Sequence, residues 1–161
     1  PRNNYGKSKL FDEKLLYTYS DSVILRLSNV YGPGIPPYKH SATATFIDQI
    51  KNEKPVTING DGTQTRDFIF IDDVIEALIL SATKKTDFRI INISTGKDIS
   101  ILNLLSHLEE IIGKKANIKF TNILDETGFW KSKNSLARKA LGWKSTVSLK
   151  KGLKLTVNSS K

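Results

Sequence analysis

The chain has 161 residues, 39% of them hydrophobic, which is the size of one domain with a sizeable core. It has no cysteine, which excludes disulfides and thiolate metal sites, and no run approaches the roughly 18 apolar residues of a membrane span. The net charge is +9, but the lysines are scattered singly or in pairs without interleaved aromatic residues, which favours a solvated basic surface over a nucleic-acid interface.

The first motif is a tyrosine and a lysine at the start of a helix predicted from Lys7 to Tyr19. Tyr5 and Lys9 are four residues apart, so their side chains leave the same helical face one turn apart. A phenol, with a pKa of about 10, carries protons poorly at neutral pH, but a neighbouring ammonium lowers that pKa towards the range of a general acid or base. Alone, this common pattern favours an ordinary surface helix.

A near-continuous apolar run from Ser22 to Val30 follows and predicts an internal parallel strand. The run stops at the turn signal Tyr31-Gly-Pro-Gly34. Ligands of open α/β sheets bind beyond the carboxyl ends of strands, which places Ser28 and Asn29 where chemistry is expected. The alternative is that Asn29 merely shapes the turn by bonding the backbone.

The middle of the chain alternates between loops, strands and helices. We expect a loop from Ile35 to His40, a helix capped by Ser41 and ending before Pro55, and a second apolar strand from Phe68 to Ile71. A short strand is expected at Val56–Asn59, before the tight turn Gly60-Asp-Gly62. Asp72 and Asp73 are predicted to cap the helix 74–82, a structural role that we prefer to catalysis.

Arg66 comes shortly after the glycine-rich turn. A guanidinium offers paired, planar donors that match a phosphate, and it stays charged at every relevant pH. Arg66 is therefore a candidate pyrophosphate clamp. A salt bridge to Asp61 or Asp67 is the alternative.

The last third of the chain predicts further elements of both kinds. A strand at Phe88–Ile93 precedes a helix at Ile101–Ile112, whose apolar stripe ends at Gly113. A strand at Asn117–Phe120 is followed by a loop through Trp130 and by two short helices, around 136–141 and 149–157. His107 lies off the apolar stripe of its helix, and with only one other histidine, His40 in a loop, no metal site is expected.

Several motifs together resemble one family. They are Tyr5-Gly-Lys-Ser-Lys9, Arg26-Leu-Ser-Asn-Val-Tyr-Gly-Pro-Gly34, Gly60-Asp-Gly-Thr-Gln-Thr-Arg-Asp-Phe-Ile-Phe-Ile-Asp-Asp73, Asn92-Ile-Ser-Thr-Gly96 and Leu141-Gly-Trp143. In order and spacing the chain resembles the NAD-dependent epimerase/dehydratase family, extended short-chain dehydrogenases that act on nucleotide sugars. The resemblance runs from Tyr5 to about Leu155 and matches only the C-terminal half of such an enzyme. With no methionine, even at position 1, the sequence is expected to be a piece of a longer protein.

The resemblance implies an α/β fold in two parts: the C-terminal part of a Rossmann-like parallel sheet and a smaller α/β substrate-binding domain. Residues 1–34 would be the last part of the NAD-binding Rossmann domain. Residues 35–161 would be mainly the substrate-binding domain, with 68–93 returning to the Rossmann sheet.

The resemblance also implies roles for residues at the cofactor. Tyr5 would be the catalytic acid/base that exchanges a proton with a sugar hydroxyl while hydride passes to or from NAD. Lys9 would hold the nicotinamide ribose and favour the phenolate. Ser28 would place its backbone against the nicotinamide. NAD is the implied cofactor and NADP the alternative.

The implied substrate is a nucleotide-diphosphate sugar. The side-chain amide of Asn29 would meet its phosphates, and Arg66 would bind the diphosphate. Thr57 and Asn59 lie on the strand whose backbone in relatives meets the nucleotide base.

The sequence departs from the family pattern in three places. The glycine-rich G-x-x-G-x-x-G turn that holds NAD and the catalytic Ser or Thr upstream of the tyrosine are both absent from these residues. Near the end, Lys133 stands about where relatives carry an Asp. This last departure could indicate an unusual sugar.

We therefore expect a cytoplasmic NAD-dependent nucleotide-sugar epimerase, of which these 161 residues alone would be inactive. Epimerisation is preferred because it needs only the parts named above; a 4,6-dehydratase or a reductase of the same family is the alternative. A non-catalytic binding or dimerisation module is the alternative of another class. The apolar stripe of the first helix, with Phe11 and Leu15, suits a homodimer interface. Neither a nucleic acid nor a membrane is an expected partner.

Overall fold

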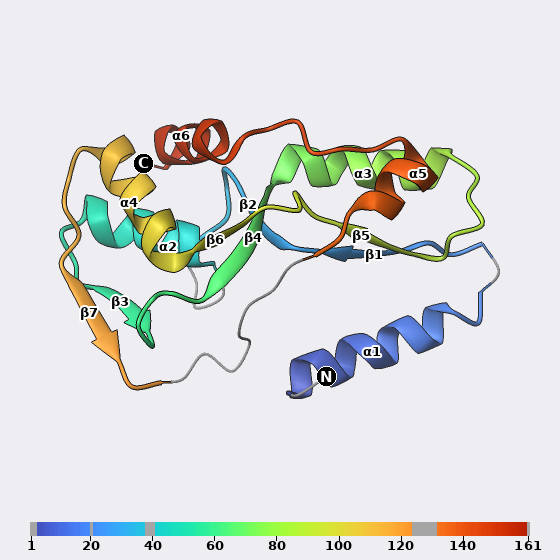
Figure 1. The fold of residues 1–161 in the computed structure, drawn as a ribbon, viewed down its shortest axis with the longest axis horizontal. Helices are drawn as coiled ribbons and strands as arrows, with labels where there is room; N and C mark the ends of the chain where they lie inside the picture. The colour runs from blue at the N-terminus through green and yellow to red at the C-terminus, as the bar shows by residue number, and fades with distance from the viewer. Residues whose placement is uncertain (1–2, 20, 38–40, 124–131, 161) are drawn as a thin grey trace.

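The computed structural model describes residues 3–19, 21–37, 41–123 and 132–160 and has an α/β fold, as predicted (Figure 1). The helices are α1 (Asn4–Leu16), α2 (Ala42–Lys51), α3 (Ile71–Thr83), α4 (Ile101–Ile112), α5 (Ser135–Leu141) and α6 (Leu149–Ser159). The strands are β1 (Ile24–Leu27), β2 (Asn29–Tyr31), β3 (Val56–Asn59), β4 (Thr65–Phe70), β5 (Ile90–Ile93), β6 (Asp98–Ser100) and β7 (Ile118–Thr121).

The strand pairs are mostly parallel: β1 with β5, β2 with β4, and β3 with β7, while β4 and β6 are antiparallel. The single strand predicted from Ser22 to Val30 is wrong, because the chain changes partners at Ser28. The Ser28 N–H donates to Ile93 O of β5 at 3.0 Å, and the next residue, Asn29, is already in register with Phe68 of β4. This segment therefore connects two sheets, and Ser28 and Asn29 lie at the junction.

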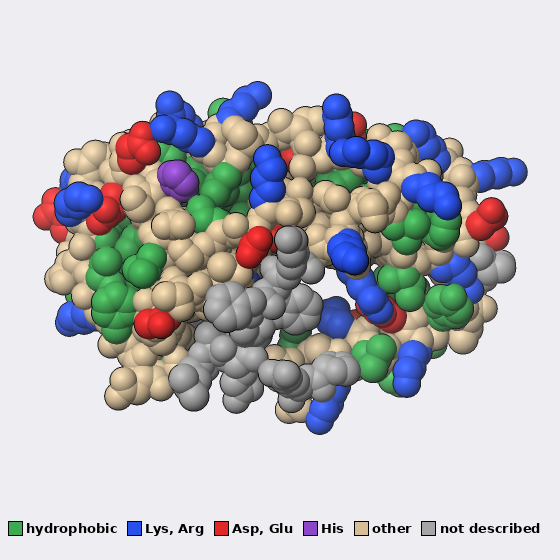
Figure 2. Space-filling view, viewed as in Figure 1, with side chains coloured by type: hydrophobic (Ala, Val, Ile, Leu, Met, Phe, Trp, Pro, Cys, Tyr) green, Lys and Arg blue, Asp and Glu red, His purple; other side chains and the backbone are tan. Residues whose placement is uncertain are grey.

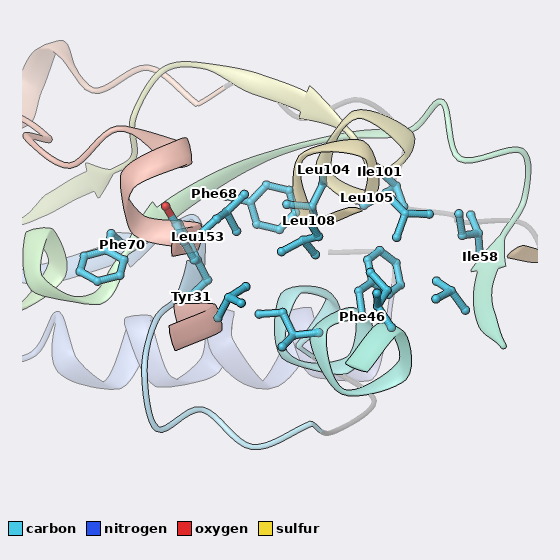
Figure 3. Packing of buried hydrophobic residues seen from close by; sticks show 14 residues of the cluster. Tyr31, Phe46, Ile58, Phe68, Phe70, Ile101, Leu104, Leu105, Leu108 and Leu153 are labelled. Carbon is cyan, nitrogen blue, oxygen red and sulfur yellow. The ribbon is translucent and has the colours of Figure 1, made fainter. Parts of the chain in front are cut away.

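Two hydrophobic cores lie on either side of that junction. In one, Leu104, Leu105 and Leu108 of α4 pack with Phe46 of α2, and Tyr31 is also part of the cluster (Figure 3). The other is formed by residues of β4, β5, α3 and α5 together with Trp143. The two cores hold the strands whose ends make the junction.

The helix α1 lies apart from both cores (Figure 1). It starts three residues earlier than predicted because the Asn3 side chain accepts a hydrogen bond from Gly6 N at 2.8 Å, and it ends at Leu16. None of its residues is buried, and Phe11 is 67% exposed. Polar contacts attach α1 to β1: Nε and Nη2 of Arg26 on β1 donate to the carboxylate of Glu13 on α1, at 2.8 and 2.6 Å.

A second arginine attaches the end of α1 to the rest of the chain. The Arg89 guanidinium donates to the carbonyls of Leu16, Tyr17 and Tyr19 and lies 4.1 Å from the centroid of the Tyr17 ring. Helix carbonyls at a C-terminus lack intrahelical partners, so this cation supplies the missing donors. Arg89 and the Arg26–Glu13 pair thus position the helix that carries Tyr5.

The predicted N-cap position of Asp72 and Asp73 is wrong, although both lie in the first turn of α3, where negative charge favours the positive end of the helix. Helix α3 begins at Ile71, before either residue, and its N-cap, Phe70, makes no side-chain cap bond. Asp73 is buried instead, and its carboxylate accepts from Thr146 N at 2.9 Å and from Val147 N at 3.2 Å. Asp73 therefore anchors the segment between α5 and α6 to α3, a structural role that agrees with the preference over catalysis.

The other differences concern short elements. Strand β4 begins at Thr65, three residues before the prediction, and β5 begins at Ile90, two residues after it. Strand β6 was not predicted. Residues 38–40 and 124–130 of the two predicted loops lie outside the described residues.

Candidate functional site

Two cavities adjoin at the strand junction and share Ser28, Asn29 and Arg66. The first, of about 460 Å³, reaches Thr57 and Asn59 of β3 and is here called the Thr57 cavity. The second, of about 760 Å³, reaches Tyr5 of α1 and is called the Tyr5 cavity; it is also lined by Arg26, Leu27, Asp67, Asn92, Ser132 and Lys133. Six of the seven predicted site residues therefore line one continuous pair of cavities. The seventh, Lys9, lines neither.

A buried carboxylate that the sequence reasoning considered only as a salt-bridge partner organises the junction. Asp67 is 3% exposed, and its Oδ1 accepts from Ser28 Oγ at 3.1 Å, Thr95 N at 3.0 Å and Thr95 Oγ1 at 2.9 Å. Its Oδ2 accepts from Gly96 N at 2.7 Å. Asp67 thereby ties β4 to the turn after β5 and to Ser28. In the sequence, Asp67 stands out by its position, as an acidic residue directly before the apolar run from Phe68 to Ile71.

The side chains of Asn29 and Arg66 both donate hydrogen bonds to backbone carbonyls of β4. Asn29 Nδ2 donates to Asp67 O at 3.3 Å, so the amide does bond the backbone, as the alternative held. Arg66 Nη1 donates to Thr65 O at 2.7 Å. Both side chains nevertheless line the two cavities, where amide and guanidinium donors suit an anionic ligand.

The far end of the Thr57 cavity is formed by β3 and the turn that follows it. Thr57 and Asn59 alternate with the buried Val56 and Ile58, so both face away from the core. Asn59 Oδ1 accepts from Thr121 Oγ1 of β7 at 2.9 Å. The exposed face of β3 therefore offers polar groups to the cavity.

The turn after β3 requires glycine. Gly62 has a φ of +78°, and a Cβ there would lie 2.7 Å from Leu102 Cγ. A side chain is thus excluded both by the left-handed backbone and by the close approach of α4.

Tyr5 and Lys9 lie one turn apart on α1, as their spacing predicts. Tyr5 is 72% exposed, and Lys9 Nζ lies 5.9 Å from the centroid of its ring. Lys9 Nζ donates to Asp12 Oδ2 at 2.9 Å, and this hydrogen bond raises the pKa of Lys9. Lys9 therefore remains a cation beside the phenol, with Asp12 as a partner that was not foreseen. The catalytic roles of both residues stay predictions.

Two further observations concern the part of the chain that is described. There, no group of three or more metal-binding side chains occurs, and no helix combines the length and apolar character that crossing a membrane demands. Lys and Arg side chains are spread over the face seen in Figure 2 and do not gather into one stripe.

The chain is similar to known proteins of one family. The family model described as "NAD dependent epimerase/dehydratase family" matches residues 1–94. The UDP-glucuronate 4-epimerase of Thermodesulfobacterium geofontis is 40% identical over 100% of this chain and 51% of its own length.

Solved structures agree as well. The UDP-glucuronic acid 4-epimerase of Bacillus cereus, in complex with UDP-glucuronic acid and NAD, is 37% identical with a TM-score of 0.89 over 99% of this chain and 52% of its own. The UDP-glucose 4-epimerase of Thermotoga maritima, with UDP-glucose, is 31% identical with a TM-score of 0.89 over 96% of this chain and 52% of its own. The predicted Rossmann-like fold class is thereby confirmed.

The chain spans about half the length of the curated relatives that it matches. The family model covers more than half of the chain, and the relative from Thermodesulfobacterium geofontis is 40% identical over the whole of it. The chain belongs to the NAD-dependent epimerase/dehydratase family.

Proposed function

We propose that this chain forms the substrate-binding side of an NAD-dependent nucleotide-sugar epimerase. The observation that carries the proposal is that Tyr5, Asn29 and Arg66 line one cavity, which continues through Asn29 and Arg66 to Thr57 and Asn59. A nucleotide sugar is a chain of base, diphosphate and sugar, and the paired cavities offer a suitable group for each. The similar solved structures with UDP-glucuronic acid and with UDP-glucose support this ligand class.

In the proposed complex the diphosphate lies where the two cavities meet. Arg66 donates paired hydrogen bonds to it, and the Asn29 amide adds a neutral contact. The nucleotide then occupies the Thr57 cavity, beside Thr57 and Asn59. This leaves the sugar in the Tyr5 cavity, within reach of the phenol.

The reaction that we propose begins with proton transfer. Tyr5 removes the proton from a sugar hydroxyl and returns it at the end of the cycle. Lys9 stabilises the phenolate electrostatically; its ammonium also donates to Asp12, and this hydrogen bond raises the pKa of Lys9. Hydride acceptance from the sugar carbon, and hydride return, is the chemistry that NAD supplies when bound.

The residues present fit one side of that cofactor. The exposed Tyr5 phenol lines the same cavity as Ser28, which lies at the carboxyl end of β1, where open α/β sheets bind ligands. We propose that Lys9 and the Ser28 backbone contact the nicotinamide end. The 161 residues contain no glycine-rich dinucleotide turn, so in this proposal the pyrophosphate of NAD is held by residues beyond them. NADP is the alternative cofactor.

The same geometry serves a 4,6-dehydratase or a reductase, which the family also implies. We prefer the epimerase because it needs no additional acid and base.

We keep the predicted division of the chain: 1–34 with the NAD-binding domain, 35–161 mainly with the substrate domain, and 68–93 returning to the Rossmann sheet. A cytoplasmic homodimer that associates through α1 completes the proposal.

Replacement of Arg66 tests the ligand assignment. Loss of a charged hydrogen bond to the diphosphate weakens binding by about 1.5–3 kcal/mol, or roughly 10- to 100-fold in Kd. We expect this loss for Arg66→Ala when UDP-glucose is titrated calorimetrically into the 161-residue chain. Arg138→Ala is the control, because Arg138 is exposed on α5 and lines neither cavity. Equal affinities of Arg66→Ala and the unmodified chain would remove the clamp.

A further inference from the structure

The charged side chains that line the Tyr5 cavity differ in whether they have a hydrogen-bonding or charged partner. The cavity is lined by Arg26, Arg66, Asp67 and Lys133. Arg26 is paired with the Glu13 carboxylate at 2.6 Å, and the Asp67 carboxylate accepts four hydrogen bonds. Lys133, by contrast, makes no hydrogen bond or ion pair with the residues that the structure describes. The cavity is thus lined by an exposed cation that has no charged partner among the described residues.

The backbone beside Lys133 is fixed at the strand junction. Asn134 Nδ2 donates to Ser94 O at 2.8 Å, and Ser94 is fully buried at the end of β5. Ile93, one residue earlier, accepts the hydrogen bond from Ser28 N, so the same strand end supports both Ser28 and Asn134. Lys133 therefore directly precedes an anchored residue, and its exposed side chain lines the same cavity as Ser28.

We infer that Lys133 binds an anionic substituent of the sugar itself, which makes a nucleotide-diphosphate hexuronate the preferred ligand. The inference rests on the proposed function, in which Arg66 takes the diphosphate where the cavities meet and the sugar extends towards Tyr5. Lys133 lines the Tyr5 cavity and not the Thr57 cavity, so it lies on the sugar side. A neutral hexose offers hydroxyls there, whereas a carboxylate gives the ammonium a charge-assisted partner.

The test compares three ligands on the 161-residue chain: UDP, UDP-glucose and UDP-glucuronate. The last two differ at one carbon, which is a carboxylate in the uronate. A charged hydrogen bond corresponds to about tenfold or more in Kd, so UDP-glucuronate should bind about tenfold tighter than UDP-glucose. Lys133→Gln should abolish this ratio and leave the affinities for UDP and UDP-glucose unchanged. Lys133→Arg should retain the ratio.

A matched control separates local from overall charge. The chain carries a net charge of +9, which attracts a more anionic ligand wherever the lysines lie. Lys144→Gln removes the same charge from an exposed position outside both cavities and should keep the tenfold ratio.

Three results would overturn the inference. Equal affinity of the unmodified chain for UDP-glucuronate and UDP-glucose would show no preference for the carboxylate. Equal weakening of all three ligands by Lys133→Gln would place Lys133 on the diphosphate. Both results leave the proposed function standing, whereas failure of UDP and UDP-glucose to bind at all would remove it together with the inference.

Discussion

Replacement of Asp67 by alanine should destabilise the chain strongly, because the carboxylate joins three parts of the strand junction. Four hydrogen bonds end on it, from Ser28 Oγ, Thr95 N, Thr95 Oγ1 and Gly96 N, at 2.7–3.1 Å. The two hydroxyls can rotate to other acceptors, and Thr95 Oγ1 already contacts Lys97 O at 3.2 Å. The two backbone N–H groups cannot turn away.

The expected magnitude follows from those two donors. A buried donor left without its acceptor costs about 1–3 kcal/mol, and both amides are only partly buried, so roughly 1.5 kcal/mol each is appropriate. Asp67→Ala should therefore lower the free energy of unfolding by about 3 kcal/mol. For a chain of this size that corresponds to a Tm lower by about 6–12 °C.

Urea unfolding followed by far-ultraviolet circular dichroism measures this change. Asp61→Ala is the matched control: Asp61 also accepts from a backbone N–H and a hydroxyl, Thr63 N at 2.9 Å and Thr63 Oγ1 at 2.7 Å, but it is exposed, so water replaces it. A loss for Asp67→Ala no larger than that for Asp61→Ala would refute the role of Asp67 at the junction.

Two further predictions concern α1. The Arg26 hydrogen bond lowers the pKa of Glu13, so this pair stabilises the helix above the ordinary carboxyl pKa and loses its effect as the pH falls through the lowered one. Glu13→Gln should reduce hydrogen-exchange protection of the α1 amides about fivefold at pH 7, the equivalent of about 1 kcal/mol, and this difference should shrink as the pH falls below the ordinary carboxyl pKa of 4.5; a difference that does not change as the pH falls would contradict the assignment. Leu15 is 54% exposed, so Leu15→Glu should convert a dimer to a monomer in sedimentation velocity, and a monomeric unmodified chain at tens of micromolar would remove the α1 interface.

Local patterns predict some elements of this fold with their correct bounds. Helix α4 runs from Ile101 to Ile112 as expected, because its apolar stripe is buried and Gly113 ends it with a φ of +76°. Strand β3 also has the predicted bounds, since its alternating residues are buried and exposed in turn. Where the pattern of apolar residues within one element shows which of its residues are buried, the local sequence is sufficient to predict the bounds of that element.

Long-range pairing could not be predicted in the same way. The break at Ser28 depends on two different partner strands, β5 and β4, which are distant in sequence. Asp73 resembles a helix cap, but its acceptors are used by Thr146 and Val147, more than 70 residues later. Six of the seven residues predicted from the motifs line the two cavities, whereas the role of the buried Asp67 carboxylate at the junction could not be predicted without the structure.

The central claim is that the Tyr5 phenol moves the proton of a bound sugar, and turnover of Tyr5→Phe tests it most directly. The assay is UDP-sugar epimerisation by an NAD-binding protein that contains these 161 residues, with Tyr17→Phe as the same substitution at the other end of α1. Tyr5→Phe should lose about 100- to 10,000-fold in kcat and retain UDP-sugar affinity, while Tyr17→Phe should turn over normally. A kcat for Tyr5→Phe close to that of Tyr17→Phe would contradict the account.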